Sequence, residues 1–515
     1  MLDPVKRRKP LRRILAVFAV IVTALALTIG LLFLEESWRA RRAWERCRRE
    51  LTSQGERLDA SSFIPPPVPD AENLAMAPLL APLNDYVKDP KSGAEVPRDP
   101  AAVDRLKSVN LTKLNVHSKP MPLLGGWQLG KRTRLEDWQE WLLDTPPRNS
   151  MPSGQGGRDV LAALDKYSEQ LTEFSVAAQR PLAHFPLQYE KGFAMPIRHS
   201  TVLMGFAGIY RLRALAELEA GDSEAALRDV KMLDRIAAAL QPELLLISHL
   251  VRASVISYIP QVLWEGIAQH RWSEDQLKTM QQLLSDIDLI ADHQRVVRGE
   301  RALLNDYYDK LREKRSTLSA AISGAIGIQD LRPLPDWWVL SILPQNALLY
   351  QNQVWQNRWV QELVLPVFDE STGRVYPRRQ AAAEEIQRQT QTTPYNFLAK
   401  LTLPVYPSIS VRTAATVVTL REAVVACALE RFRLKRGGYP ETLRELLPDY
   451  LPQPVQDIFS DEALLYRREG ERRYILYSVG WDATDDGGAV STEPGTPNRR
   501  NDRDGDWVWF GGDRP

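Results

Sequence analysis

The sequence predicts a mainly α-helical protein with a single N-terminal transmembrane helix, an α-helical hairpin domain and a small C-terminal α+β module. Three observations support this fold class. An uncharged apolar run occupies residues 14–34, helical periodicity dominates residues 159–400, and strand patterns follow a long helix within residues 401–515. The chain is therefore expected to divide into a membrane segment, a helical body and a terminal module.

Length and composition are typical of a globular protein. The chain has 515 residues, 44% of them hydrophobic and 25% charged, and at about 100–200 residues per domain it has room for two to four domains. The formal net charge of +1 gives no reason to expect a nucleic-acid partner. The two cysteines, Cys47 and Cys427, have no metal-ligand spacing. The pattern therefore indicates neither a disulfide framework nor a zinc site, although a single bridge between them stays open.

The N-terminus predicts a membrane anchor. Residues 14–34 form an uncharged run of 21 residues, which spans roughly 31 Å and matches the hydrocarbon core of a bilayer. Residues 1–13 are basic and favour a cytoplasmic tail, with the bulk of the chain outside the cytoplasm of a bacterium and the span in its inner membrane. A cleaved signal peptide is the alternative, because Ala24-Leu25-Ala26 resembles a cleavage site. The apolar run continues past that site, which favours an uncleaved anchor in the lipid bilayer.

The next two segments differ in pattern. Residues 35–72 predict a juxtamembrane helix and then a proline-rich linker, because the prolines of FIPPPVPD (63–70) cannot continue a helix. Residues 73–158 mix prolines, glycines and tryptophans. They indicate an irregular region with short helices.

Residues 159–400 predict an α-helical domain. Residues 203–240 have two apolar stripes separated by Gly-Asp-Ser, which is typical of a helical hairpin whose second helix is capped by Asp222 or Ser223. This pattern resembles one tetratricopeptide-like hairpin, although no second copy is visible at that period.

Later parts of this domain carry start and stop signals. Pro260 predicts a kink or helix end, and Ser273 with Gln276 predicts a capping box. The helix that follows is expected to run towards Arg315, with Gly299 as its weak point. Residues 336–363 predict a tryptophan-rich helical segment that Pro344 interrupts, too broken for a second membrane span.

Residues 401–515 predict the terminal module. A helix from about Ile409 ends in RLKRGGYP, where cations are followed by glycines and a proline. ALLYRRE and RRYILYSV then predict a β-hairpin, and an acidic tail rich in Gly and Asp closes the chain.

The order of these features resembles the globular domain of the major pseudopilin of type II secretion systems, over about residues 405–510. The matching residues are Gly438-Tyr439-Pro440, Leu443, Leu446, Tyr450-Leu451-Pro452, Asp457-Ile458-Phe459, Tyr466, Tyr474, Ser478, Gly480, Asp482, Gly487 and Gly488. The sequence departs from that family at the anchor, since the apolar run lacks a prepilin cleavage site and an internal glutamate. The resemblance therefore implies a borrowed module rather than a pilin.

The resemblance also implies calcium at Asp482, because the family binds calcium in the loop after its last strand. Asp485 and Asp486 add carboxylates to the same loop, and calcium takes six to eight oxygen ligands at about 2.3–2.6 Å. These three residues are the candidate calcium ligands. The alternative is an acidic turn that contacts only solvent.

No linear motif indicates a reaction. The histidines are His117, His184, His199, His249, His270 and His293, and the sequence contains no HExxH, GxSxG or Walker A motif. His249 lies in an apolar helix, which favours a packed core histidine. His293 and Glu300 are seven residues apart on one helix face, where an acid–base or metal pair is an alternative to a polar contact between helices.

These observations predict a membrane-anchored envelope protein with a non-catalytic binding or scaffolding role, a protein partner, and a link to a secretion or pilus-like system. An envelope hydrolase whose site is assembled from distant residues is the alternative. In a third hypothesis the terminal module contributes only stability.

Overall fold

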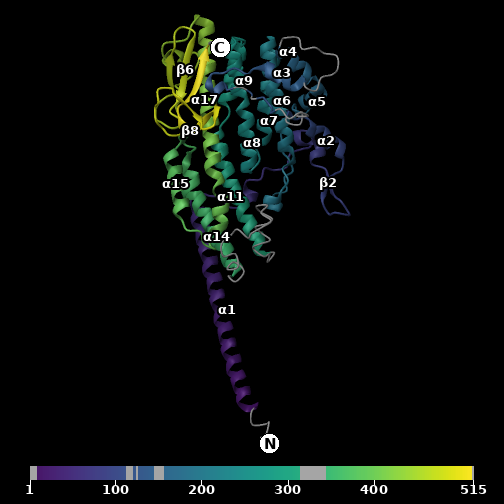
Figure 1. Ribbon diagram of the computed structural model, residues 1–515, viewed down its shortest axis with the longest axis vertical. Helices are drawn as coiled ribbons and strands as arrows, with labels where there is room; N and C mark the ends of the chain where they lie inside the picture. Colours follow the sequence, from purple (N-terminus) through teal and green to yellow (C-terminus); the bar gives the residue numbers. More distant parts are fainter. Residues whose placement is uncertain are drawn as a thin grey trace.

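The computed structural model describes residues 8–111, 120–122, 124, 126–143, 156–313 and 344–512. One long helix, α1, projects from a helical body, and the C-terminal strands lie at the opposite end of the molecule from the N-terminus (Figure 1). The described chain is mainly helical, begins with an apolar helix and has a small sheet region near its C-terminus. These three features of the predicted fold class are confirmed.

The helix α1 (Arg8–Ser53) continues for 46 residues without a break. Its apolar side chains are exposed between positions 14 and 34, and the helix is long and apolar enough to cross a membrane. The stretch Leu246–Ala268 passes the same test of length and composition, but 67% of its apolar window is buried in the body. That second stretch therefore belongs to the core.

The second half of α1 packs against α14 (Gln345–Trp359). Trp44, Cys47 and Leu51 form a buried cluster there with Val354. The predicted juxtamembrane helix is thus an extension of the apolar helix itself, and this extension lies against the body.

Glu56, just after α1, forms ion pairs with two arginines; we call this group the ion-pair lock. Glu56 Oε2 lies 3.2 Å from Arg298 Nε and also contacts Arg301, and both arginines belong to α11 (Leu289–Glu313). Burial would raise the pKa of Glu56, but the charges of Arg301 and Arg298 outweigh burial and lower the pKa. The carboxylate therefore stays ionised. The proline-rich segment 63–70 is non-helical, as predicted.

Short elements fill the region between this lock and the helical hairpin, as expected for residues 73–158. They are η1 (Ala60–Ser62), η2 (Leu74–Met76), η3 (Ala81–Leu83), β1 (Tyr86–Lys88), β2 (Glu95–Pro97), α2 (Pro100–Ser108), η5 (Trp127–Leu129), α3 (Leu135–Leu143), α4 (Gly156–Leu164), η6 (Asp165–Tyr167), α5 (Ser168–Ala177) and η7 (Tyr189–Ala194).

The predicted hairpin is formed by α6 (Arg198–Ala220) and α7 (Ser223–Leu240). Gly221 has a φ of 91°, a conformation that suits glycine, and ends α6. The Asp222 carboxylate then accepts a hydrogen bond of 2.9 Å from the Ala225 amide, so Asp222 is the cap. The next break follows α8 (Leu246–Ile256), before α9 (Tyr258–Ala268), and Pro260 lies in the first turn of α9.

The expectation of one helix running towards Arg315 is wrong. The capping box of Ser273 and Gln276 is confirmed, but α10 (Glu274–Ser285) ends before α11 begins. Asp288 explains the break, because its Oδ1 accepts from the amides of Ile290 and Ala291 and so starts a new helix. Gly299, the expected weak point, lies inside α11 and allows Leu244 to approach closely.

A long helix, α17 (Val405–Arg436), completes the helical body. It begins four residues before Ile409 and ends, as predicted, at Gly437 with a φ of 87°. Residues 336–343 of the predicted tryptophan-rich segment lie outside the described residues, and α14 begins just after Pro344. The other elements between α14 and α17 are η8 (Val360–Val364), η9 (Leu365–Val367), β3 (Phe368–Asp369), β4 (Arg374–Val375), α15 (Pro377–Gln389) and α16 (Phe397–Thr402).

The C-terminal sheet region follows η10 (Leu443–Leu446). The predicted hairpin forms from β5 (Leu465–Arg468) and β6 (Arg473–Ser478), which pair antiparallel. The expected acidic tail is wrong in structural type, because it folds as β8 (Thr496–Gly505), paired with β7 (Val490–Glu493), and as β9 (Trp507–Gly512), paired with β6. Alternate apolar side chains of WVWF pack into the core and explain why this segment is a strand.

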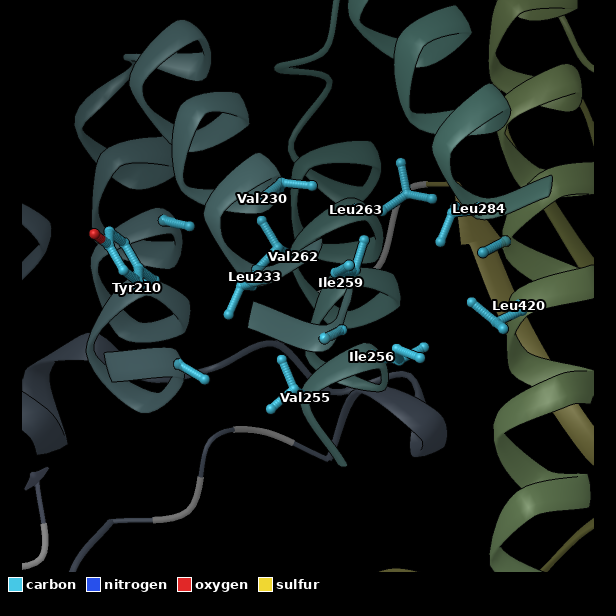
Figure 2. Packing of buried hydrophobic residues seen from close by; sticks show 14 of the residues in the cluster. Tyr210, Val230, Leu233, Val255, Ile256, Ile259, Val262, Leu263, Leu284 and Leu420 are labelled. Carbon is cyan, nitrogen blue, oxygen red and sulfur yellow. The ribbon is translucent and has the colours of Figure 1, made fainter. Parts of the chain in front are cut away.

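One buried cluster joins the hairpin, α10, α17 and the C-terminal strands. Figure 2 shows part of it, with Val230 and Leu233 of α7 near Val262 of α9, and Leu420 of α17 near Leu284 of α10. The helix α17 is therefore shared between the body and the terminal strands. Cys47 and Cys427 are buried free thiols.

Candidate functional site

An apolar cavity of about 460 Å³ lies between η7, the first turn of α8, the C-terminal half of α11, α16 and the first turn of α17. Leucine and tyrosine side chains supply most of its wall. Ile247 and Val405 are 51% and 45% exposed and form the rim. We call this space the apolar cavity.

The apolar cavity lies near the end of the membrane-length helix. The Tyr395 hydroxyl is hydrogen-bonded to Glu36, which comes two residues after the apolar run in α1. Two cavity residues, Leu398 and Leu401, belong to α16, which begins two residues after Tyr395. The end of the body from which α1 emerges also contains the start of α14 (Figure 1). The cavity therefore belongs to the end of the body nearest the apolar part of α1.

Glu300 supplies an acidic group to the wall. Its Oε2 accepts a hydrogen bond of 3.2 Å from the Leu246 amide. In the part of the chain that the structure describes, no cation forms an ion pair with Glu300. Burial raises the pKa of Glu300 to about 7, because protein surrounds the carboxyl group and disfavours its charge. Near neutral pH the group is shared between its protonated and ionised forms.

Tyr406 lies beside this carboxyl group. It is 2% exposed, and its hydroxyl has no hydrogen-bond partner among the described residues. Burial, and then the nearby Glu300, raise the pKa of Tyr406, so the hydroxyl stays protonated. A buried hydroxyl without a partner costs free energy, of the order of 1–3 kcal/mol. A ligand with an oxygen atom at this position would satisfy it.

Glu300 and Tyr406 form one part of the wall of the apolar cavity. Leu311 follows Glu300 on the same helix, about 16 Å further along at 1.5 Å per residue. Around Leu311 the wall consists of leucines and of the aromatic rings of Tyr307 and Tyr308. The cavity wall is thus mostly apolar, and it includes the Glu300 carboxyl group and the unpartnered Tyr406 hydroxyl. This arrangement can bind an amphiphilic molecule.

The second acid–base candidate, His293, does not reach the cavity. It is 1% exposed, and its ring lies 5.4 Å from that of His249 and 4.3 Å from that of Phe368. Burial lowers the pKa of His293 to about 3. His249 is a packed core histidine, and its Nε2 lies 3.0 Å from Thr413 Oγ1. His117 lies outside the described residues.

The structure also brings together a buried group that the sequence analysis missed. His199 Nε2 lies 2.5 Å from Glu243 Oε1, and Ser248 Oγ donates to Glu243 Oε2. The carboxylate stands between the hydroxyl and the imidazole. The geometry therefore differs from a serine activated directly by histidine, which needs a hydrogen bond between those two groups.

The three candidate calcium ligands lie in one turn, but the carboxylates of Asp482 and Asp485 accept hydrogen bonds from backbone amides. Asp482 accepts from the amides of Thr484 and Gly505, each at 3.0 Å. Asp485 accepts from the Gly487 amide at 2.9 Å. Among the described residues, no three acidic, histidine or cysteine side chains converge as a metal site.

Asp506, rather than Asp486, supplies the buried carboxylate of this turn. Its Oδ2 accepts from the amides of Asp486 and Gly488, at 3.1 and 2.6 Å. Calcium at Asp482, Asp485 and Asp486 stays a prediction.

A scan against protein-family models, a search of curated proteins and a search of solved structures each find no match to this chain.

Proposed function

We propose that the protein is a membrane-anchored envelope protein with a non-catalytic binding role, and that the apolar cavity holds the hydrocarbon chain of an amphiphile. The observation that carries this proposal is an apolar cavity beside the end of a membrane-length helix. Ligand cavities in proteins are mostly apolar, have a few placed polar groups and measure about 300–1,000 Å³. The cavity volume of 460 Å³ falls within that range.

The polar pair supports an amphiphile over a pure hydrocarbon. Glu300 and Tyr406 can exchange hydrogen bonds with a carbonyl, ester or hydroxyl oxygen of the ligand. A pure hydrocarbon would leave the buried Tyr406 hydroxyl without a partner. The remainder of the wall then accommodates the chain.

The proposal is tested with the full chain in proteoliposomes that contain a fatty acid with a photoactivatable diazirine in its chain. We expect labelled peptides from residues 303–311 and 398–406. The variant Leu401→Trp, which fills the cavity, is expected to reduce that labelling to background. Leu434→Trp, at an exposed position of α17, is the matched control and is expected to label like wild type. Labelling confined to residues 14–34 would contradict the proposal.

Orientation in the membrane is part of the proposal. The basic residues before the apolar run favour an N-terminus in the cytoplasm and a body outside it. Protease added to intact spheroplasts is then expected to remove a C-terminal tag. A tag that is cut only after lysis would place the body in the cytoplasm.

A protein partner in the envelope, from a secretion or pilus-like system, remains a proposal that rests on the resemblance of residues 405–510. Deleting residues 401–515 is a poor test, because the deletion removes α17 from the common core. Cross-linking the intact chain in native membranes, followed by mass spectrometry, is the better experiment. Cross-links to no other envelope protein would contradict the scaffold role.

A further inference from the structure

A second space lies along the seam between α8 and α17. It measures about 310 Å³, and its wall includes Ser254 at the end of α8, Thr416 on α17, and three arginines. The arginines are Arg412 of α17 and Arg499 and Arg500 of β8. We call this space the basic pocket.

The two spaces lie on the same faces of two helices that contact each other. Val405 at the rim of the apolar cavity and Arg412 in the basic pocket are seven residues apart on α17, which is about two turns and about 10 Å. On α8, Ile247 and Ser254 have the same spacing. One extended molecule can therefore occupy both spaces.

The basic pocket has unbalanced positive charge. Arg500 is buried and paired with Asp502 at 3.0 Å, so these two charges cancel. Arg499 has an exposed partner, Glu493, at 3.4 Å, and such surface pairs are weak. Arg412 is exposed and has no ion pair among the described residues. The Thr416 hydroxyl donates to the Arg412 carbonyl within its own helix, so the arginines are the groups that attract an anion.

We propose that this seam binds a phosphate-bearing, long-chain amphiphile, with its chain in the apolar cavity and its phosphate at Arg412 and Arg499. The inference rests on the proposed function and adds the chemical class of the ligand. The apolar wall would accommodate the hydrocarbon chain of a phospholipid, and Glu300 and Tyr406 would bind its ester oxygens. The arginines would bind its phosphate, so the three groups follow the order of the parts of the lipid. The apolar end lies nearest the membrane-length part of α1, so the order also matches a lipid in the leaflet that faces the body.

The test compares two photoactivatable lipids in proteoliposomes of the full chain. Both carry the same diazirine chains, but phosphatidic acid has a phosphate that diacylglycerol lacks. We expect phosphatidic acid to label residues 398–406 roughly tenfold more, because one charge-assisted hydrogen bond is worth about a factor of ten. Arg412→Glu should abolish this preference, and Arg412→Lys should keep most of it. Arg444→Glu changes an exposed arginine outside the seam and should have no effect.

The other outcomes separate this inference from the proposed function. Equal labelling by both lipids, unchanged in Arg412→Glu, would overturn the inference and leave the proposed function standing. No labelling of the cavity by either lipid would overturn both. Loss of the preference on adding inorganic phosphate at millimolar concentration would identify a free anion as the occupant and would overturn the lipid assignment. Thermal melting of each variant shows whether it is folded. If Arg412→Glu does not fold, Arg412→Gln removes the same positive charge and should also lose the preference.

Discussion

Two adjacent residues of α11 face opposite surroundings. Arg301 is fully buried against the end of α1, where Glu56 neutralises its charge. Glu300 faces the apolar cavity, and no cation among the described residues pairs with it. Burial acts on both acids, yet the pKa of Glu56 is lowered and that of Glu300 is raised to about 7. The arginines beside Glu56 outweigh its burial, whereas Glu300 is buried without a cationic partner among the described residues.

This difference suggests a structural role for Glu56 and a ligand-binding role for Glu300. The Glu56 ion pairs join the segment directly after α1 to α11. The Glu300 carboxyl makes one hydrogen bond to the backbone and leaves capacity for a ligand. Within one turn of α11, Arg301 is thus neutralised by Glu56, whereas the Glu300 carboxyl group still has a free hydrogen-bonding position. We call the first the closed contact and the second the open carboxyl.

Breaking the closed contact should have the largest effect. Glu56→Gln leaves Arg301 buried without a counter-charge, and we expect a loss of about 3–5 kcal/mol in the free energy of unfolding. Guanidinium unfolding followed by tryptophan fluorescence measures this loss. Glu50→Gln, at an exposed position on α1, is the control and should change stability by under about 0.5 kcal/mol. If both variants unfold at the same denaturant concentration, the lock contributes nothing.

Removing the open carboxyl should have an effect of opposite sign that depends on pH. The folded protein keeps Glu300 protonated up to about pH 7, whereas the unfolded chain ionises it from about pH 4.5. Stability is therefore lost as pH rises through this window, by about 3 kcal/mol at 1.36 kcal/mol per pKa unit.

The variant Glu300→Gln lacks this dependence. We expect it to match wild type at pH 4.5 and to exceed it by about 3 kcal/mol at pH 8. Unfolding curves measured across pH 4–8 test this expectation. Parallel pH profiles for the two proteins would show that Glu300 is charged in the folded state, and would remove the contrast with Glu56.

A second pH effect comes from His293, in the core beside the cavity. The pKa of His293 is about 3 in the folded protein and about 6.5 in an unfolded chain. The folded state excludes the proton, so stability falls as pH falls below 6.5, by about 2 kcal/mol at pH 5. His293→Phe should flatten the profile by that amount, while His249 keeps its own contribution of the same sign. An unchanged slope between pH 5 and 6.5 would contradict the buried neutral histidine.

The smallest expected effect concerns the acidic turn. If Asp482, Asp485 and Asp486 bind calcium, a concentration about five times Kd should stabilise the protein by about 1 kcal/mol. Melting with calcium and with magnesium, for wild type and for Asp485→Asn, measures this. An identical melting temperature with and without calcium would leave the turn held by its backbone hydrogen bonds alone.

Much of the fold could be predicted because its signals are local. The apolar run, the Asp222 cap, the capping box of Ser273 and the glycine after α17 each act within a few residues of chain. The break at Asp288 was missed because helical periodicity outweighed a single capping residue. The last strand was missed because its acidic neighbours resembled a metal-binding loop, although the alternation in WVWF was visible.

The candidate site could be predicted only in part. The sequence analysis identified Glu300 from its spacing to His293, but in the structure Glu300 lies beside Tyr406 rather than beside His293. The actual neighbour, Tyr406, is more than a hundred residues away in the chain and lies in an unremarkable apolar segment. A cavity is a property of packing between distant helices, and no pattern within one helix records the space left between them.

The continuous helix α1 also has a mechanical consequence. A flexible tether lets a domain sample many heights and rotations above a bilayer. If α1 spans the bilayer as we propose, the unbroken helix packed against α14 would instead transmit its tilt directly to the body. Transmembrane helices tilt when the hydrocarbon thickness of the bilayer changes. A thicker or thinner bilayer would therefore rotate the rim at Ile247 and Val405 towards or away from the lipid surface. Under the proposed anchoring, membrane thickness would thus control the access of lipids to the apolar cavity.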